Sequence, residues 1–167
     1  MKASAKNERR KMKKQLTLVL TKPEVLEIRM DEVRKDLKIV GPIVLEEVVE
    51  ITETMIKVMY PNDSEHQRKV NLEYLRGKKV RAFVLEGPNI IEDVVTFVGK
   101  ETNPERCHPR SLRFRACSNW DFPLPVLMPD DTEYYFNGFH RTKTAEEFEQ
   151  QAPVILNGSF HKLVSAR

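Results

Sequence analysis

Apolar residues recur along the chain with two different spacings, and these spacings predict a mixture of strands and helices. Residues 16–20 form a continuous aliphatic run that ends before Pro23, which predicts a buried strand because proline cannot continue strand pairing. Residues 25–39 place apolar side chains near one face of a helix, which the Gly-Pro pair at 41–42 ends. Residues 43–51 alternate loosely between apolar and polar, as in a second strand.

The middle of the chain continues this succession. Thr52 is placed to cap a short helix, and a further helix is predicted over residues 64–75. Residues 80–85 form the second strongly apolar run and predict a strand, whereas residues 89–98 return to helical spacing. Strands and helices therefore alternate without an internal repeat.

The last third of the chain is less regular. Residues 101–131 are rich in Pro, Arg and Asp and predict a long irregular loop, which in a compact domain is usually functional or inserted. A short strand is predicted over 134–136, and Thr144 begins a capping-box pattern that opens a helix through about Gln151. The order of elements predicts an α+β fold, an antiparallel sheet covered by helices with split βαβ connections of the ferredoxin-like type.

The composition is that of an ordinary globular protein, with 167 residues of which 40% are hydrophobic and 32% charged. That length predicts one domain. No stretch reaches the roughly 18 apolar residues that a membrane-spanning helix needs, and no apolar signal region opens the chain, so we expect an intracellular, cytoplasmic protein. Cys107 and Cys117 are expected to be free thiols, and because they lack zinc spacing with His108, no metal site is expected.

Positive charge is concentrated at the start of the chain. Residues 1–16 contain seven basic residues and one acidic residue, while the whole chain has a net charge of +3. Residues 1–14 are therefore predicted to form a basic, flexible arm in which Lys11, Lys13 and Lys14 contact the acidic surface of a protein assembly. Nucleic-acid binding is disfavoured because the arm lacks interleaved aromatic residues and any reader motif.

Three motifs carry a resemblance to a known family. They are L-T-L-V-L-T-K-P-E at 16–24, F-V-L-E-G-P-N-I-I at 83–91 and G-K-E-T-N-P-E-R-C-H-P-R-S-L-R-F-R at 99–115. In this order they resemble the nucleoside diphosphate kinases, in which a strand ends in E-G-x-N and a G-E-T-N-P run leads to an arginine. The resemblance covers residues 15–152 and leaves the arm and a predicted C-terminal docking tail, 153–167, unmatched.

The resemblance implies a chemistry and a set of binding residues. The family transfers the γ-phosphate of a nucleoside triphosphate to a diphosphate through a phosphohistidine, with Mg²⁺ on the phosphates. Lys22 matches a lysine that contacts phosphate, and Tyr60 matches a tyrosine near the catalytic histidine. Thr102 and Arg113 match the hydroxyl and guanidinium that hold the phosphates. These four residues imply a retained nucleotide-binding set.

The same resemblance implies that the nucleophile is missing. The family's last strand ends N-I-I-H-G-S-D, and aligning it with residues 134–140 puts Asn137 at the histidine. An amide nitrogen is neither basic nor nucleophilic at pH 7 and cannot carry a phosphoryl group. In this alignment Tyr134 replaces a ribose-contacting Asn, Phe139 replaces the Ser after the histidine, and Phe148 replaces the Glu that orients it.

Two functions follow from these differences. The first, and the expected one, is a catalytically inactive structural or interaction module, because the family's second phosphate-binding arginine also falls on Val94 or Val95. Relatives with degenerate domains occur in ciliary and flagellar axonemes, so the resemblance implies an axonemal role with tubulin as the acidic partner. The alternative is an active but divergent kinase that uses His140 as its nucleophile.

An inserted stretch, residues 118–132, is much longer than its family counterpart and rich in apolar residues and proline. It could fill the nucleotide cleft or form a docking surface for a partner. Because an exposed apolar loop is unfavourable unless something covers it, we expect the docking surface, with Trp120, Phe122 and Leu124 as its contacts.

Overall fold

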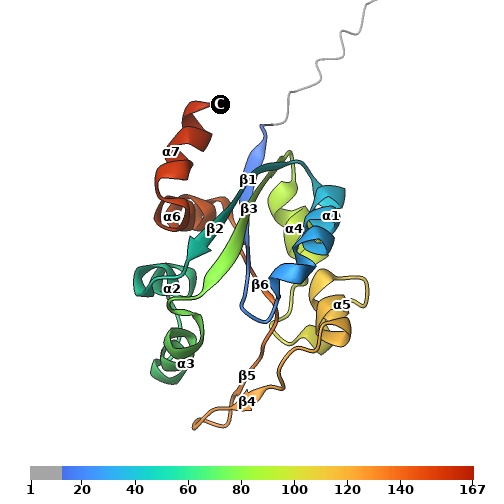
Figure 1. Ribbon diagram of the computed structural model, residues 1–167, viewed down its shortest axis with the longest axis vertical. Coiled ribbons are helices and arrows are strands. Elements are labelled where there is room, and N and C mark those ends of the chain that lie inside the picture. The colour runs from blue at the N-terminus through green and yellow to red at the C-terminus, as the bar shows by residue number, and fades with distance from the viewer. Residues whose placement is uncertain (1–12) are drawn as a thin grey trace, which may run out of the picture.

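The computed structural model describes residues 13–167, and its centre is a four-stranded sheet (Figure 1). The strands lie in the order β2 (Ile43–Glu50), β3 (Lys79–Gly87), β1 (Gln15–Thr21) and β6 (Phe139–Arg141). Every neighbouring pair is antiparallel. A separate two-stranded hairpin joins β4 (Val126–Leu127) to β5 (Glu133–Tyr134).

The connections between the strands give the sheet its ferredoxin-like topology. The β1 and β2 strands run parallel, are joined through α1 (Met30–Val40), and are separated by β3. The β3 and β6 strands, joined through α4 (Ile90–Val98) and the segments that follow it, are likewise separated by β1. Two split βαβ units therefore share one sheet, which confirms the predicted α+β fold.

Helices cover both faces of this sheet (Figure 1). One face carries α1, α4 and α5 (Leu112–Asn119). The other face carries four helices: α2 (Glu53–Met59), α3 (Glu65–Leu75), α6 (Ala145–Leu156) and α7 (Gly158–Ser165). Short 3₁₀ turns at Glu27–Arg29 and Pro104–Arg106 complete the described elements.

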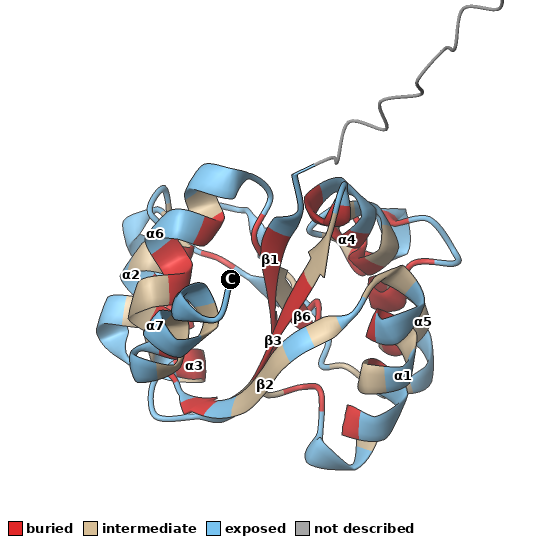
Figure 2. Ribbon diagram, turned by 90° about the horizontal axis from the view of Figure 1, so that it is seen from above, coloured by how far each residue is buried: buried red, intermediate tan, exposed pale blue. Residues whose placement is uncertain are grey.

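The strands divide their side chains between two apolar cores. Leu18 and Leu20 point to the core under α2, α3 and α6, whereas Val19 points to the core under α1, α4 and α5. Phe83 and Val84 of β3 divide in the same way. This alternation follows from the two-residue period of a strand, and it makes β1 buried along nearly its whole length (Figure 2).

Three predicted helix starts are confirmed by their caps. The hydroxyl of Thr52 accepts the backbone N–H of Met55 at 3.2 Å. Ser64 and Gln67 form a reciprocal capping box, and the hydroxyl of Thr144 accepts the N–H of Glu147 at 3.1 Å. Such bonds satisfy N–H groups that have no partner within the helix.

Two predictions about the last third of the chain were wrong. Residues 101–131 are not an irregular loop, because they contain α5, which Ser111 caps and which buries Leu112 and Ala116. The strand expected at 134–136 is displaced, since β5 ends at Tyr134 and the strand in the main sheet is β6. Phe136 instead packs in an aromatic cluster, with its ring centroid 4.9 Å from that of Tyr74.

The segment predicted as a docking tail is helical. Residue 153 lies inside α6, which continues through Pro153 to Leu156, and α7 follows. Phe160 and Leu163 pack against the core under α6, so this segment contacts the chain's own domain. Both cysteines are free thiols, as predicted. Within residues 13–167, no helix is long and apolar enough to cross a membrane.

The predicted basic arm lies almost entirely outside the described residues. Lys11 is among the residues that the structure does not describe. Lys13 and Lys14 begin the described part, both exposed, and Lys14 Nζ lies 2.9 Å from a carboxylate oxygen of Glu86. The partner contact expected of these lysines stays a prediction.

Candidate functional site

A cavity of about 260 Å³ opens where β1 ends beside β6. It lies against the α2 to α3 connection, the segment after α4, and α6. Six residues singled out from the sequence line it: Lys22, Tyr60, Thr102, Arg113, Asn137 and His140. Segments that are more than 100 residues apart in sequence therefore meet in one polar cavity.

Lys22 and Asn137 form a buried polar pair on one wall of this cavity. Lys22 follows β1, and its Nζ donates to Asn137 Oδ1 at 2.9 Å. Asn137 in turn donates from Nδ2 to the carbonyl of Thr102 at 3.1 Å. Burial lowers the pKa of Lys22 to about 8, against the opposing charge of Glu24. An anion bound in the cavity would stabilise this ammonium group.

His140 lies in β6 opposite Leu20, and two neighbours fix its imidazole. Its Nε2 lies 2.7 Å from Gln151 Oε1 of α6, and the Tyr60 ring meets it edge-on at a centroid distance of 5.2 Å. Because an amide oxygen can only accept, Nε2 carries the proton and Nδ1 keeps its lone pair. Burial is the main cause that lowers the pKa of His140 to about 3; the hydrogen bond to Gln151 opposes this shift and nearby cations add to it. The imidazole is therefore neutral at pH 7.

Arg113 ties three segments together beneath the cavity. Its guanidinium donates to the carbonyls of Gly99 and Glu101 at 3.1 and 3.0 Å, and to that of Phe139 at 2.6 Å. The side chain is buried, and burial together with the charge of Arg141 lowers its pKa to about 10. The arginine that the sequence assigned to phosphate thus also fixes the start of β6.

Arg141 lines the same cavity and was missed by the sequence analysis. It is 4% exposed, and its guanidinium donates to the carbonyls of Gly99 at 2.6 Å and Lys100 at 3.3 Å. Burial lowers its pKa. Strand alternation from the buried Phe139 would have placed Arg141 inward, but only if residues 139–141 had been recognised as a strand.

The charges and unpaired donors of the cavity suit a polyanion. Among residues 13–167, three buried side-chain polar atoms have no hydrogen-bond partner: Tyr60 Oη, Arg113 Nε and Arg141 Nε. Lys100 and Lys143 add positive charge to the lining, opposed by Asp63, Glu133 and Glu147. In the described part of the chain, no three His, Cys, Asp or Glu side chains cluster to hold a metal ion.

The inserted stretch divides between the core and the surface. The Trp120 ring lies 5.7 Å from the Arg29 guanidinium and 6.5 Å from the Phe139 ring, and Phe122 packs against the same core. Leu124 remains 85% exposed. Trp120 and Phe122 are therefore half-buried against the chain's own domain, whereas Leu124 is exposed, and the partner contact expected of the three stays a prediction.

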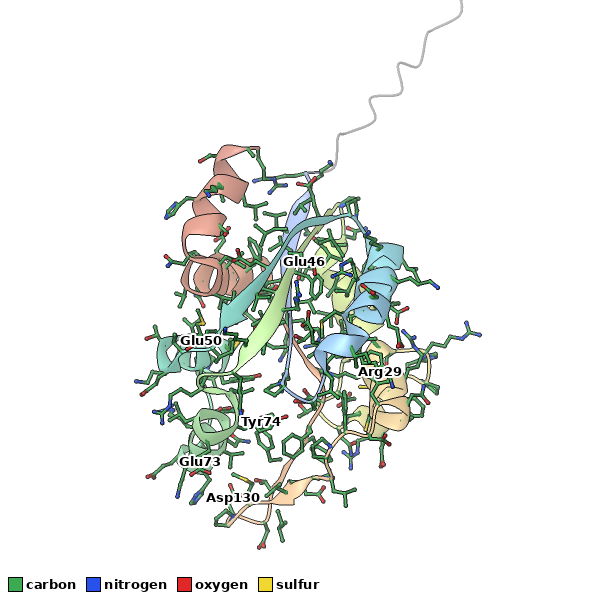
Figure 3. The ribbon with its side chains drawn as sticks, in the orientation of Figure 1. Arg29, Glu46, Glu50, Glu73, Tyr74 and Asp130 are labelled. Carbon is green, nitrogen blue, oxygen red and sulfur yellow. The ribbon has the colours of Figure 1, made fainter. Side chains whose placement is uncertain are left out.

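The rest of the insertion forms β4 and the turn of the β4–β5 hairpin. Figure 3 shows Asp130 at the tip of this hairpin and Tyr74 on α3. Tyr134 of β5, which follows the insertion, donates to Asn71 Oδ1 at 2.6 Å, and both residues line the cavity. Residues 118–132 do not line the cavity, so the insertion does not fill it.

The sequence and the fold can be compared with those of known proteins. No family model and no curated protein matches the sequence. Among solved structures, the nucleoside diphosphate kinase of Aquifex aeolicus is similar at 19% identity and a TM-score of 0.67, covering 88% of this chain and 98% of that one. The chain has the nucleoside diphosphate kinase fold.

Two further structures agree. The Borrelia burgdorferi nucleoside-diphosphate kinase, solved as a transition state mimic with vanadate and ADP, is 21% identical with a TM-score of 0.64, covering 84% of this chain and 86% of that chain. An NDP kinase from Pyrobaculum aerophilum is 19% identical with a TM-score of 0.63, covering 83% and 93%. At these identities the likeness concerns the fold.

Proposed function

We propose that this protein is an active nucleoside diphosphate kinase in which His140 carries the phosphoryl group. The observation that carries the proposal is the state of this imidazole. It is neutral, its Nε2 proton is held by Gln151, and its unprotonated Nδ1 belongs to a ring that lines a cavity with Lys22 and Arg113. This is the arrangement that a histidine nucleophile needs beside a polyphosphate.

The spacing of the family motif supports the same assignment. In N-I-I-H-G-S-D, an asparagine precedes the histidine by three residues and a serine follows it by two. Asn137 precedes His140 by three residues, and Thr142 follows it by two. A shift of three residues thus aligns Asn137 with the ribose-contacting asparagine and restores a hydroxyl after the histidine. Here the Thr142 hydroxyl holds β6 to β1, accepting the N–H of Leu18 at 3.0 Å.

The residue that orients the imidazole also supports the assignment of His140 as the nucleophile. With Asn137 aligned to the histidine, the orienting glutamate fell on Phe148, eleven residues later. Eleven residues after His140 stands Gln151, which bonds the imidazole. The differences that favoured an inactive module therefore reduce to two, an amide in place of a carboxylate and the absent arginine of α4.

The proposed reaction needs no group beyond those in the cavity and the substrates. The Nδ1 lone pair of His140 attacks the γ-phosphorus of a nucleoside triphosphate, and the bond from that phosphorus to its bridging oxygen breaks, releasing the diphosphate. A second diphosphate then takes the phosphoryl group by the reverse step. Lys22 and Arg113 would neutralise the phosphate oxygens, and Mg²⁺ on the nucleotide would neutralise further charge.

Phosphoenzyme formation tests the proposal. Purified protein is incubated with γ-labelled ATP and Mg²⁺ and scored for an acid-labile label, then for transfer of that label to GDP. We expect label on the native protein and on the His161→Ala control, which alters an exposed histidine of α7, and none on His140→Ala. An unlabelled native protein, or a label that survives His140→Ala, would overturn it.

A further inference from the structure

The helix expected to supply a second phosphate-binding arginine does not contain one. Val94, one of the two candidate positions, is fully buried in the core, and Val95 is half-buried. Neither side chain can donate a hydrogen bond or carry charge. If a second guanidinium serves the cavity, it must come from another element.

We propose that Arg141 of β6 is a phosphate-binding residue that replaces this arginine. The inference rests on the proposed function, because it assigns a further contact in the same nucleotide cavity. The guanidinium of Arg141 reaches the C-terminal end of α4 from the neighbouring strand, donating to the carbonyls of Gly99 and Lys100. It lines the cavity together with Lys22 and Arg113.

The charge around Arg141 is the main argument. Arg113 and Arg141 both donate to the carbonyl of Gly99, so two guanidinium groups lie side by side while each is about 5% exposed or less. Among residues 13–167, neither forms a salt bridge, and every hydrogen bond that their side chains donate ends on a backbone carbonyl. Two adjacent buried cations without a carboxylate are unfavourable unless an anion compensates them.

Two guanidinium nitrogens without hydrogen-bond partners also favour a bound anion. The Nε of Arg113 and the Nε of Arg141 are both buried without a hydrogen-bond partner. A phosphate group offers several acceptor oxygens and negative charge, and arginine binds such groups through paired hydrogen bonds. A phosphate bound in the cavity would supply the negative charge and acceptor oxygens that these two side chains lack among residues 13–167.

Nucleotide binding separates this role from a structural one. The affinities of ADP with Mg²⁺ and of adenosine are measured by calorimetry for the native protein, Arg141→Gln and Arg141→Lys. The control is Arg115→Gln, which alters an α5 arginine paired with Asp36 outside the cavity. The melting temperature of each ligand-free protein is measured alongside, because a structural arginine and a phosphate-binding arginine affect it differently.

We expect Arg141→Gln to weaken ADP binding roughly ten- to a hundredfold, the usual effect of losing a charge-assisted hydrogen bond. Arg141→Lys should recover part of this loss, and adenosine affinity should not change. The ligand-free melting temperature should not fall, since the substitution removes one of two adjacent buried cations.

Unchanged ADP affinity in Arg141→Gln with a lowered melting temperature would overturn the inference and make Arg141 structural. If that variant does not fold, Arg141→Lys decides, since native ADP affinity there would show that the fork of the guanidinium is not used. A native protein that binds ADP but forms no phosphoenzyme would overturn the proposed function and leave this inference supported or overturned by the variants. A native protein that binds no ADP would overturn both.

Discussion

Two neighbouring residues of β6 face opposite sides of the sheet and meet opposite environments. His140 points toward α6, where burial keeps its imidazole neutral and where Gln151 and the Tyr60 ring hold it in place. Arg141 points toward the end of α4, where it lies beside a second arginine. Strand alternation turns the two side chains to opposite faces of β6, yet both line the same cavity. One strand of three residues would thus supply both the nucleophile and a phosphate-binding cation of the proposed site.

The orientation of the neutral His140 imidazole depends on Gln151. Removing the Gln151 amide should therefore have the largest effect of the changes considered. In Gln151→Leu the proton of His140 is no longer held on Nε2, so the tautomer with a free Nδ1 lone pair loses its preference. The imidazole gains positive charge as Nδ1 attacks phosphorus, so its hydrogen bond to Gln151 becomes charge-assisted in the transition state. We therefore expect phosphoenzyme formation in single-turnover measurements to slow roughly a hundredfold, the upper range for losing such a bond. ADP affinity should stay within about twofold of the native value.

The matched control is Gln150→Leu, which changes the exposed neighbour on α6. A Gln151→Leu protein that is as fast as the control would show that the hydrogen bond to His140 does not orient the nucleophile. Gln151→Glu adds a sharper comparison, because a carboxylate would favour the protonated imidazole and raise the pKa of His140. It should restore the family's pairing and keep the rate at least at the native level.

The contrast also explains what could be predicted from the sequence. Leu18 and Val19 alternate between two apolar cores, so β1 could be predicted from its hydrophobic residues alone. The β6 strand carries His140 and Arg141, and its neighbours Tyr134 and Phe136 form a more apolar run that is not part of the main sheet. A polar strand after an insertion has no hydrophobic signal to fix its register. The proposed function shifts this alignment by three residues, so that His140 rather than Asn137 takes the place of the family's histidine.

Arg141 could not be assigned for a related reason. Its role depends on the carbonyls of Gly99 and Lys100, more than 40 residues earlier in the chain. Lys22, Thr102 and Arg113 were found because they lie in the three motifs, and Tyr60 was found from the same resemblance; all four line the cavity. A residue that replaces a missing one from a different element leaves no motif, and only the fold brings it to the cavity.

Gly138 lies directly before β6. A methyl group added at this position should disturb both His140 and Arg141. Its φ is +75°, and a Cβ would lie 2.6 Å from Phe122 Cζ. Gly77 has nearly the same φ, +76°, with nothing within 4 Å of such a Cβ. We expect Gly77→Ala to cost about 1 kcal/mol in unfolding free energy from backbone strain alone, and Gly138→Ala about 2 kcal/mol or more from strain and overpacking.

Urea denaturation of the two variants measures this difference. Equal destabilisation would mean that Phe122 moves away without cost, and that the inserted segment does not support the turn before β6. If Gly138→Ala is the less stable variant and also slows phosphoenzyme formation more than Gly77→Ala, the turn positions His140 as well as stabilising the fold.

The rate of phosphoenzyme formation at acidic pH tests whether the His140 imidazole stays neutral, and its expected change is the smallest. Only an unprotonated imidazole can attack phosphorus, and at pH 5.5 a histidine with an ordinary pKa of about 6.5 would be roughly nine-tenths protonated, slowing the reaction about tenfold. Since the pKa of His140 is lowered to about 3, we expect single-turnover rates to stay within about twofold between pH 7.5 and 5.5. A tenfold fall centred near pH 6.5 would instead mean that the imidazole is solvated and protonates freely.

The lowered pKa of His140 also makes the folded protein less stable in acid. This loss of stability limits how low the pH of the rate measurements can be. Between the folded pKa of about 3 and the ordinary value near 6.5, the unfolded chain binds a proton at His140 that the folded chain does not. The free energy of unfolding therefore decreases as pH falls through this range. A rate that stays flat while stability declines would be specific to a buried neutral nucleophile, because an exposed histidine would slow the reaction over the same pH range without weakening the fold. Circular dichroism at each pH separates the two effects.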